Sequence, residues 1–138
     1  MFFSVFNSCG FSTVFLIGFF TDLSFTVYNV SGYAQPYIYS INDEIGLFDA
    51  NALLNSGDCE DEYGELLVGA GRYDGGIANI LTVGSIDFCE YGGYQLAGWV
   101  PGNDIIIKVW DASEDFEYYA LATFESNSQW GDLYTVIT

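Results

Sequence analysis

The chain has 138 residues, the size of one ordinary domain, and its 51% content of hydrophobic residues predicts a packed core. Nineteen carboxylates face only two basic residues, which gives a formal net charge of −17 at pH 7. Because nucleic acids and anionic membrane surfaces are both bound through clusters of Lys and Arg, this balance argues against both kinds of partner. The chain contains no histidine, so Ser-His-Asp and Cys-His catalysis are excluded.

Residues 1–21 form an uncharged segment rich in Phe, Val, Ser and Thr. A signal peptide needs a basic start and small residues at its cleavage point, and a membrane-spanning helix tolerates few of the polar interruptions present here. The aromatic and β-branched content favours extended strands. Three alternatives stay open: core strands of the same domain, burial in a neighbouring subunit, or an export or membrane segment.

Residues 22–138 form one predicted domain of short strands joined by tight turns. Leu23, Phe25 and Val27 alternate with polar or smaller neighbours, which is the period of a half-buried strand. Further strands are predicted at 36–41, 45–48, 65–72, 80–86, 94–100, 105–110, 118–125 and 133–137. Gly, Pro, Asn and Asp separate them. About nine strands of this kind predict an all-β fold, a β-sandwich of jelly-roll or immunoglobulin-like type.

Several motifs stand in order between residues 42 and 124. They are DEIGLFD at 43–49, GELLVGAG at 64–71, GY at 93–94, PGN at 101–103 and KVWDASE at 108–114. In order and spacing they resemble β-sandwich modules of secreted and cell-surface proteins of the Bacteroidetes and related marine bacteria, often found ahead of C-terminal sorting domains. The resemblance covers a little over half of the chain. It implies an extracellular or cell-surface domain with an adhesive or structural role and carries over no catalytic residues.

Three cysteines fit such a compartment. Cys59 lies in the loop before the 65–72 strand and Cys89 follows the 80–86 strand, so a hairpin can bring the two together. We predict a disulfide between them, closing a loop of about 30 residues and contributing about 3 to 4 kcal/mol. Cys9 is left over, either buried as a small apolar residue or paired between chains.

Acidic clusters are the candidates for a metal site. One consists of Asp58, Glu60, Asp61 and Glu62 with Glu65 nearby, and a second lies at residues 111–117. Oxygen ligands without His or thiolate select calcium, which is the one cofactor that the sequence leaves open. The first cluster is not an EF-hand loop, because Tyr63 stands where that loop requires glycine. The alternative is a solvated acidic surface.

Other features have both a functional and a structural interpretation. Carboxylate pairs can hydrolyse glycosides, but no pair stands out among the nineteen acids, so we expect no enzyme. Lys108, alone in an apolar strand, is expected to pair with a carboxylate of the next strand rather than to form an internal isopeptide crosslink. Asn29 begins a glycosylation sequon. Aromatic rings are candidates either for stacking on sugars or for the core, namely Tyr91, Tyr94, Trp99, Trp110, Tyr118, Tyr119 and Trp130.

Two functions follow from these observations. In the first, the chain is a non-enzymatic structural subunit of an extracellular assembly or filament, and its partner is another copy of itself. The joining residues would insert into a neighbouring subunit, and they are Phe11, Val14, Phe15, Leu16, Ile17, Phe19 and Phe20. In the second, the chain is a monomeric carbohydrate-binding or adhesion module with a glycan as its partner.

Overall fold

The computed structural model describes the backbone of residues 13–17, 24–28 and 34–38, together with residues 40–138 apart from 77, 126, 133, 134, 136 and 138. The predictions about Phe11, Phe19, Phe20, Cys9 and Asn29 concern positions outside the described residues. Most of the strand expected at 133–137 also lies outside them, although Ile137 forms an isolated β-bridge with Phe124.

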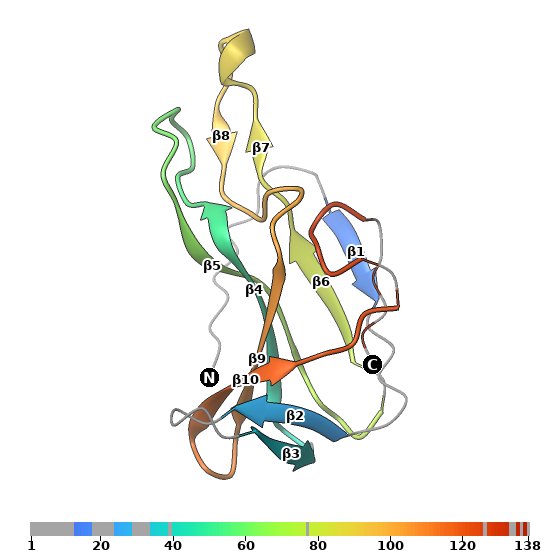
Figure 1. Cartoon of the computed structure of the whole chain (residues 1–138). Coiled ribbons are helices and arrows are strands. Elements are labelled where there is room, and N and C mark those ends of the chain that lie inside the picture. The colour runs from blue at the N-terminus through green and yellow to red at the C-terminus, as the bar shows by residue number, and fades with distance from the viewer. Residues whose placement is uncertain are drawn as a thin grey trace.

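The described part of the chain is all-β apart from one short 3-10 turn. A six-stranded antiparallel sheet has the order β3-β2-β10-β9-β4-β5, and two smaller sheets pair β1 with β6 and β7 with β8 (Figure 1). The elements are β1 Thr13–Ile17, β2 Ser24–Tyr28, β3 Ala34–Ile38, β4 Glu44–Leu53, β5 Tyr63–Arg72, β6 Asn79–Val83, β7 Ile86–Asp87, η1 Cys89–Tyr91, β8 Gln95–Leu96, β9 Ile105–Asp111 and β10 Phe116–Leu121.

The hydrophobic core forms around β4, which lies between β5 and β9 in the large sheet. Residues 45–49 of β4 are buried in succession, and because side chains alternate along a strand, both faces of this stretch are covered. Trp99 and Trp130 stack in the same core, with ring centroids 5.6 Å apart. These two rings and the buried Tyr118 are therefore part of the core and are not available for stacking on sugars.

The continuous strands expected at 80–86 and 94–100 are each interrupted in the structure. The first divides into β6 and β7 at Gly84, and the second is a strand only at Gln95–Leu96. A Cβ on Gly84 would lie 2.9 Å from the Trp99 ring, and one on Gly98 would lie 2.4 Å from the Gly84 backbone. The two segments therefore cross at close range, and isolated bridges at Gly84 and Gly98 replace a regular ladder.

Candidate functional site: a disulfide-linked tip

Cys59 and Cys89 form a disulfide, the pairing predicted from the sequence, with their Cα atoms 6.0 Å apart. The bond joins the loop between β4 and β5 to the turn between β7 and β8. We call residues 54–62 and 86–97 the tip. The β7–β8 hairpin projects beyond the large sheet, beside the β4–β5 loop (Figure 1). Two segments far apart in the sequence are thus fixed to each other at one end of the molecule.

Gln95 provides a second connection within the tip. Its side chain is fully buried, and its Oε1 accepts a hydrogen bond of 2.7 Å from Asn55 Nδ2. Its Nε2 donates to Asp87 Oδ2 at 3.0 Å and also to Asp61 Oδ1. Backbone bonds run in parallel, from Gln95 N to the Asp58 carbonyl and from Gly57 N to the Gln95 carbonyl. A buried amide whose oxygen and nitrogen are both satisfied gives the tip a fixed polar interior.

The hydrogen bonds also keep Asp87 ionised. The backbone N–H of Cys89 donates to Asp87 Oδ1 at 2.9 Å, and this bond, followed by the one from Gln95, lowers the pKa of the Asp87 carboxyl. Both bonds favour the charged form because both donors point at carboxylate oxygens. Asp87 therefore holds the start of the turn while contributing a negative charge.

Three aromatic side chains are exposed on the tip. Phe88, Tyr91 and Tyr94 have relative exposures of 50%, 85% and 47%. Phe88 and Tyr94 face each other next to the Asp87–Gln95 pair, and Phe88 N donates to the Tyr94 carbonyl at 3.1 Å. Since side chains alternate along a strand, this pair lies on the hairpin face opposite to Gln95. One face of the hairpin is therefore polar and faces the β4–β5 loop, and the other is aromatic and faces solvent.

The tight turn that carries these rings depends on two glycines. Gly92 ends η1 with φ of 72°, in the left-handed region. A Cβ on Gly93 would lie 2.7 Å from the Phe88 Cβ, so a side chain there would displace the ring. The turn geometry therefore sets the position of Phe88.

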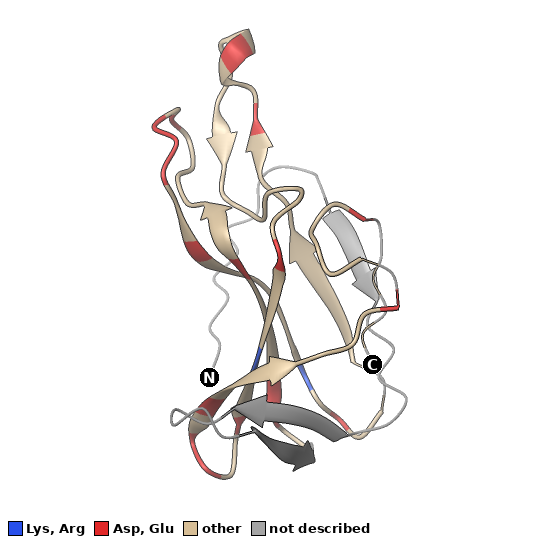
Figure 2. Ribbon diagram, viewed as in Figure 1, with Lys and Arg blue, Asp and Glu red and all other residues tan. Residues whose placement is uncertain are grey.

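The tip is also strongly acidic. It carries six exposed carboxylates and no Lys or Arg, and the basic residues Arg72 and Lys108 lie in β5 and β9, away from it (Figure 2). The carboxylates are Asp58, Glu60, Asp61, Glu62, Asp87 and Glu90.

The calcium candidates of the first acidic cluster are partly engaged in hydrogen bonds within the tip. Asp58 Oδ1 accepts from Asn55 Nδ2 at 2.7 Å, and Asp61 accepts from Gln95. Glu60 and Glu62 lie in the same loop. Within the described residues, no group of three or more His, Cys, Asp or Glu side chains is arranged to hold a metal ion.

In the second cluster, Asp111 Oδ1 accepts hydrogen bonds from the Ser113 and Glu114 backbone N–H groups and from the Ser113 hydroxyl. This carboxylate therefore stabilises the turn between β9 and β10.

Lys108 pairs with a carboxylate of the next strand, β10, as expected, and more closely with one of β5, which lies beyond β4 in the sheet. Its Nζ lies 2.7 Å from Glu65 Oε1 and 3.6 Å from Glu117 Oε1, and its side chain is 7% exposed. The ammonium also lies 4.3 Å from the centroid of the Phe48 ring and 4.9 Å from that of Tyr119. Burial alone would lower the pKa of Lys108, but the hydrogen bond to Glu65 and the charges of both carboxylates outweigh it and raise the pKa.

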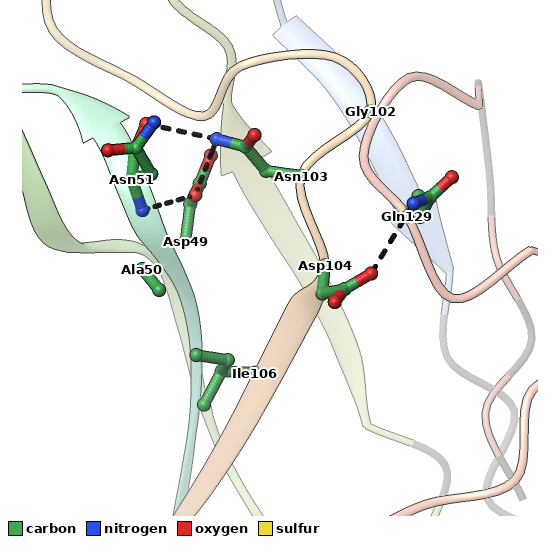
Figure 3. A pocket seen from close by; sticks show the side chains of 8 residues that line it. All are labelled: Asp49, Ala50, Asn51, Gly102, Asn103, Asp104, Ile106 and Gln129. Atoms are coloured by element: carbon green, nitrogen blue, oxygen red, sulfur yellow. Dashed lines mark hydrogen bonds between the residues drawn. The ribbon is translucent and has the colours of Figure 1, made fainter.

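A shallow groove near Asp49 is a second candidate. Its volume is about 370 Å³. It is lined by Asp49, Ala50, Asn51, Gly102, Asn103, Asp104, Ile106 and Gln129 (Figure 3).

The buried Asp49 carboxylate at this groove is fully engaged. It accepts hydrogen bonds from Val100 N, Asn51 N and Asn103 Nδ2, all between 2.8 and 3.0 Å. It therefore holds the 100–103 turn against β4, which is a structural role. No aromatic ring lines the groove, so it lacks the stacking surface that sugar sites use.

Four of the residues expected to join subunits, Val14, Phe15, Leu16 and Ile17, lie in β1. This strand pairs antiparallel with β6 of its own chain, with Phe15 opposite Leu81. Within one chain β1 thus pairs as a strand of the same domain, and insertion into a neighbouring subunit stays a prediction. Leu81, in β6 of the same small sheet, is 51% exposed.

Comparison of the chain with protein-family models, curated proteins and solved structures gives no match. In the described part of the chain, no helix has the length and apolar character to cross a membrane. The class that the structure defines is therefore an all-β domain with a crosslinked, aromatic and acidic tip. Disulfides of this kind persist in oxidising compartments.

Proposed function

We propose that the chain is a non-enzymatic extracellular adhesion module that contacts its partner through the tip. The observation that carries the proposal is the exposure of Phe88, Tyr91 and Tyr94 on a projection that a disulfide and the buried Gln95 hold in place. Large rings gathered in one exposed place are typical of interaction surfaces. A projection with a polar interior has no need of three outward-facing rings for its own stability.

The energetics support binding by such a surface. Each large ring that a partner covers contributes about 1.5 to 3 kcal/mol of apolar burial. Ordering of loops and side chains subtracts from this gain, and it is reduced where the surface is already fixed in the free protein. The disulfide and the Gln95 hydrogen bonds supply that preorganisation.

The non-enzymatic and extracellular parts of the proposal have separate support. Asp49, Asp61 and Asp87 each accept hydrogen bonds that stabilise the fold, so these carboxylates already have structural roles. The disulfide and the resemblance to surface modules both favour an oxidising, extracellular location.

Retention of the purified, labelled protein on the surface of the producing cells tests adhesion by the tip. The Phe88→Ser/Tyr91→Ser variant should lose saturable retention, because it removes rings without altering charge. Ile41→Ser is the matched control, since Ile41 is 66% exposed and lies in the turn before β4, outside the tip. Equal retention of both variants would contradict the proposal.

A β-sandwich is the proposed form of the fold, with the β1–β6 sheet as part of the second layer. The close approach of β6 to β5 supports it, since a Cβ on Gly69 would lie 2.5 Å from the Leu81 carbonyl oxygen. Ile80 of β6 is buried in the core that β4 and β5 also form.

Self-assembly through residues 1–21 is the second candidate function, in the form of strand exchange. Because β1 pairs with β6 alone among the described strands, a β1 from another copy can make the same five-residue ladder. Mixing Phe15→Cys chains with Leu81→Cys chains tests this, since these positions are opposite in the ladder. If strands exchange, a disulfide forms between the two chains; if β1 pairs only within its own chain, none forms. A variant that carries both Phe15→Cys and Leu81→Cys is the control for pairing within one chain.

A further inference from the structure

We propose that the partner of the tip is a polypeptide surface rich in Lys and Arg, an inference that rests on the proposed adhesive function. The first reason is charge. Residues 54–62 and 86–97 carry six of the nineteen carboxylates and neither of the two basic residues of the chain. A negative projection on a chain of net charge −17 attracts cationic surfaces and repels anionic ones.

The second reason is the combination of rings with carboxylates. Glu90 and Tyr91 are neighbours in η1, and Phe88 and Tyr94 form the exposed face of the same hairpin. A guanidinium or ammonium group gains from an aromatic face and from a carboxylate at the same time. Rings alone fit many apolar partners, but rings next to unneutralised carboxylates favour a cation with an apolar stem.

The chain itself contains this chemistry at Lys108. The Lys108 ammonium lies between two carboxylates, Glu65 and Glu117, and two rings, Phe48 and Tyr119. At that position all four contacts are made within one molecule. The tip presents the same two kinds of group outward, without a cation among its own residues.

Other occupants fit the tip less well. A second copy that meets the tip with its own tip would bring six further carboxylates to the contact, which is a repulsive arrangement. Nucleic acids and acidic polysaccharides are repelled for the same reason. A neutral sugar would stack on the rings but would gain no charge attraction from the six carboxylates, and the groove near Asp49 has no aromatic residue in its lining.

The test is an NMR titration of the disulfide-intact, full-length protein with a hexa-arginine peptide. Amide shifts should concentrate in residues 54–62 and 86–97 and should weaken as salt is added. Phe88→Ser and Tyr91→Ser should each reduce the affinity roughly two- to five-fold, the effect of one exposed cation–π contact. Ile41→Ser should leave it unchanged.

A charge-matched pair separates the tip from the general acidity of the chain. Glu60→Gln/Glu62→Gln removes two charges from the tip, and Glu125→Gln/Asp132→Asn removes two exposed charges elsewhere. The first variant should weaken binding of the peptide several-fold more than the second. An equal loss in the two, or shifts spread evenly over all acidic regions, would overturn the inference.

A parallel titration with cellohexaose distinguishes this inference from the proposed function. Tip shifts with cellohexaose and none with hexa-arginine would show that the tip binds a neutral glycan; the cationic partner would then be wrong and the adhesive function would stand. If neither probe shifts the tip and the ring variant is retained on cells like the native chain, both are wrong.

Discussion

Lys108→Met is expected to destabilise the fold even though methionine preserves the apolar packing of the stem. The substitution removes a charge-assisted hydrogen bond of 2.7 Å to Glu65 and the contacts of the ammonium with the Phe48 and Tyr119 rings. It leaves Glu65 and Glu117 without their shared cation in the large sheet.

The magnitude follows from the exposure of the two partners. The side chains of Glu65 and Glu117 are 45% and 37% exposed, so water replaces part of the lost interaction. The hydrogen bond then contributes about 1 kcal/mol, and the ring contacts add about 0.5 to 2 kcal/mol depending on desolvation. We expect a loss of about 1.5 to 3 kcal/mol in the free energy of unfolding, below the 3 to 5 kcal/mol typical of a fully buried broken pair.

Urea unfolding of Lys108→Met and Arg72→Met measures this loss. Arg72 is exposed at the end of β5, and its substitution removes the same unit of positive charge from an acidic chain. The difference between the variants therefore reports the local contacts of Lys108 and not the change in net charge. Equal unfolding midpoints with equal urea dependence would refute the reasoning.

Three further predictions follow from the same structure. Replacing Cys59 and Cys89 by serine should lower the free energy of unfolding by about 3 to 4 kcal/mol, with hydrogen exchange accelerated first at the tip; unchanged protection there would contradict the crosslinking role. Gly69→Ala should cost more than about 1 kcal/mol in thermal unfolding, because the new Cβ would meet the β6 backbone at 2.5 Å, and a neutral result would show that β6 does not lie there. The hydrogen bond to Glu114, aided by burial, raises the pKa of Tyr118 to about 12. The resulting stability is full below about pH 10, where tyrosine titrates in the unfolded chain, and is lost as pH rises through 12; Tyr118→Phe should abolish this alkaline dependence in pH-dependent unfolding.

The elements that the sequence predicted well are those with a local signal. β5 and β9 have the apolar runs or alternation of strands, and the turns around Cys59 and Cys89 predict that these residues lie in adjoining loops. The sequence predicts β4 only at 45–48, and the strand continues to Leu53. The interruption between β6 and β7 has a weak local signal, Gly84 inside the expected strand, which does not tell what approaches it. It arises because Trp99, distant in the chain, packs on Gly84.

The polar residues that organise the candidate sites were missed for a related reason. Asp49 and Gln95 are fully buried, and several of their partners are 34 to 54 residues away in the chain. A carboxylate that follows the apolar run of β4, and the turn sequence at 101–103, were the available signals. The aromatic residues show the same limit, since Trp99 belongs to the core and Tyr91 to the surface only by their tertiary position.

Photo-crosslinking from the tip tests the central claim most directly. A benzophenone side chain is placed at position 91, where the native tyrosine is 85% exposed, or at position 41 as the control, and the protein is irradiated on the producing cells. Adhesion through the tip predicts a discrete crosslinked product from position 91 and none from position 41, and a cationic partner predicts in addition that hexa-arginine competes this product away. Products of equal yield from both positions, or from position 41 alone, would contradict the account.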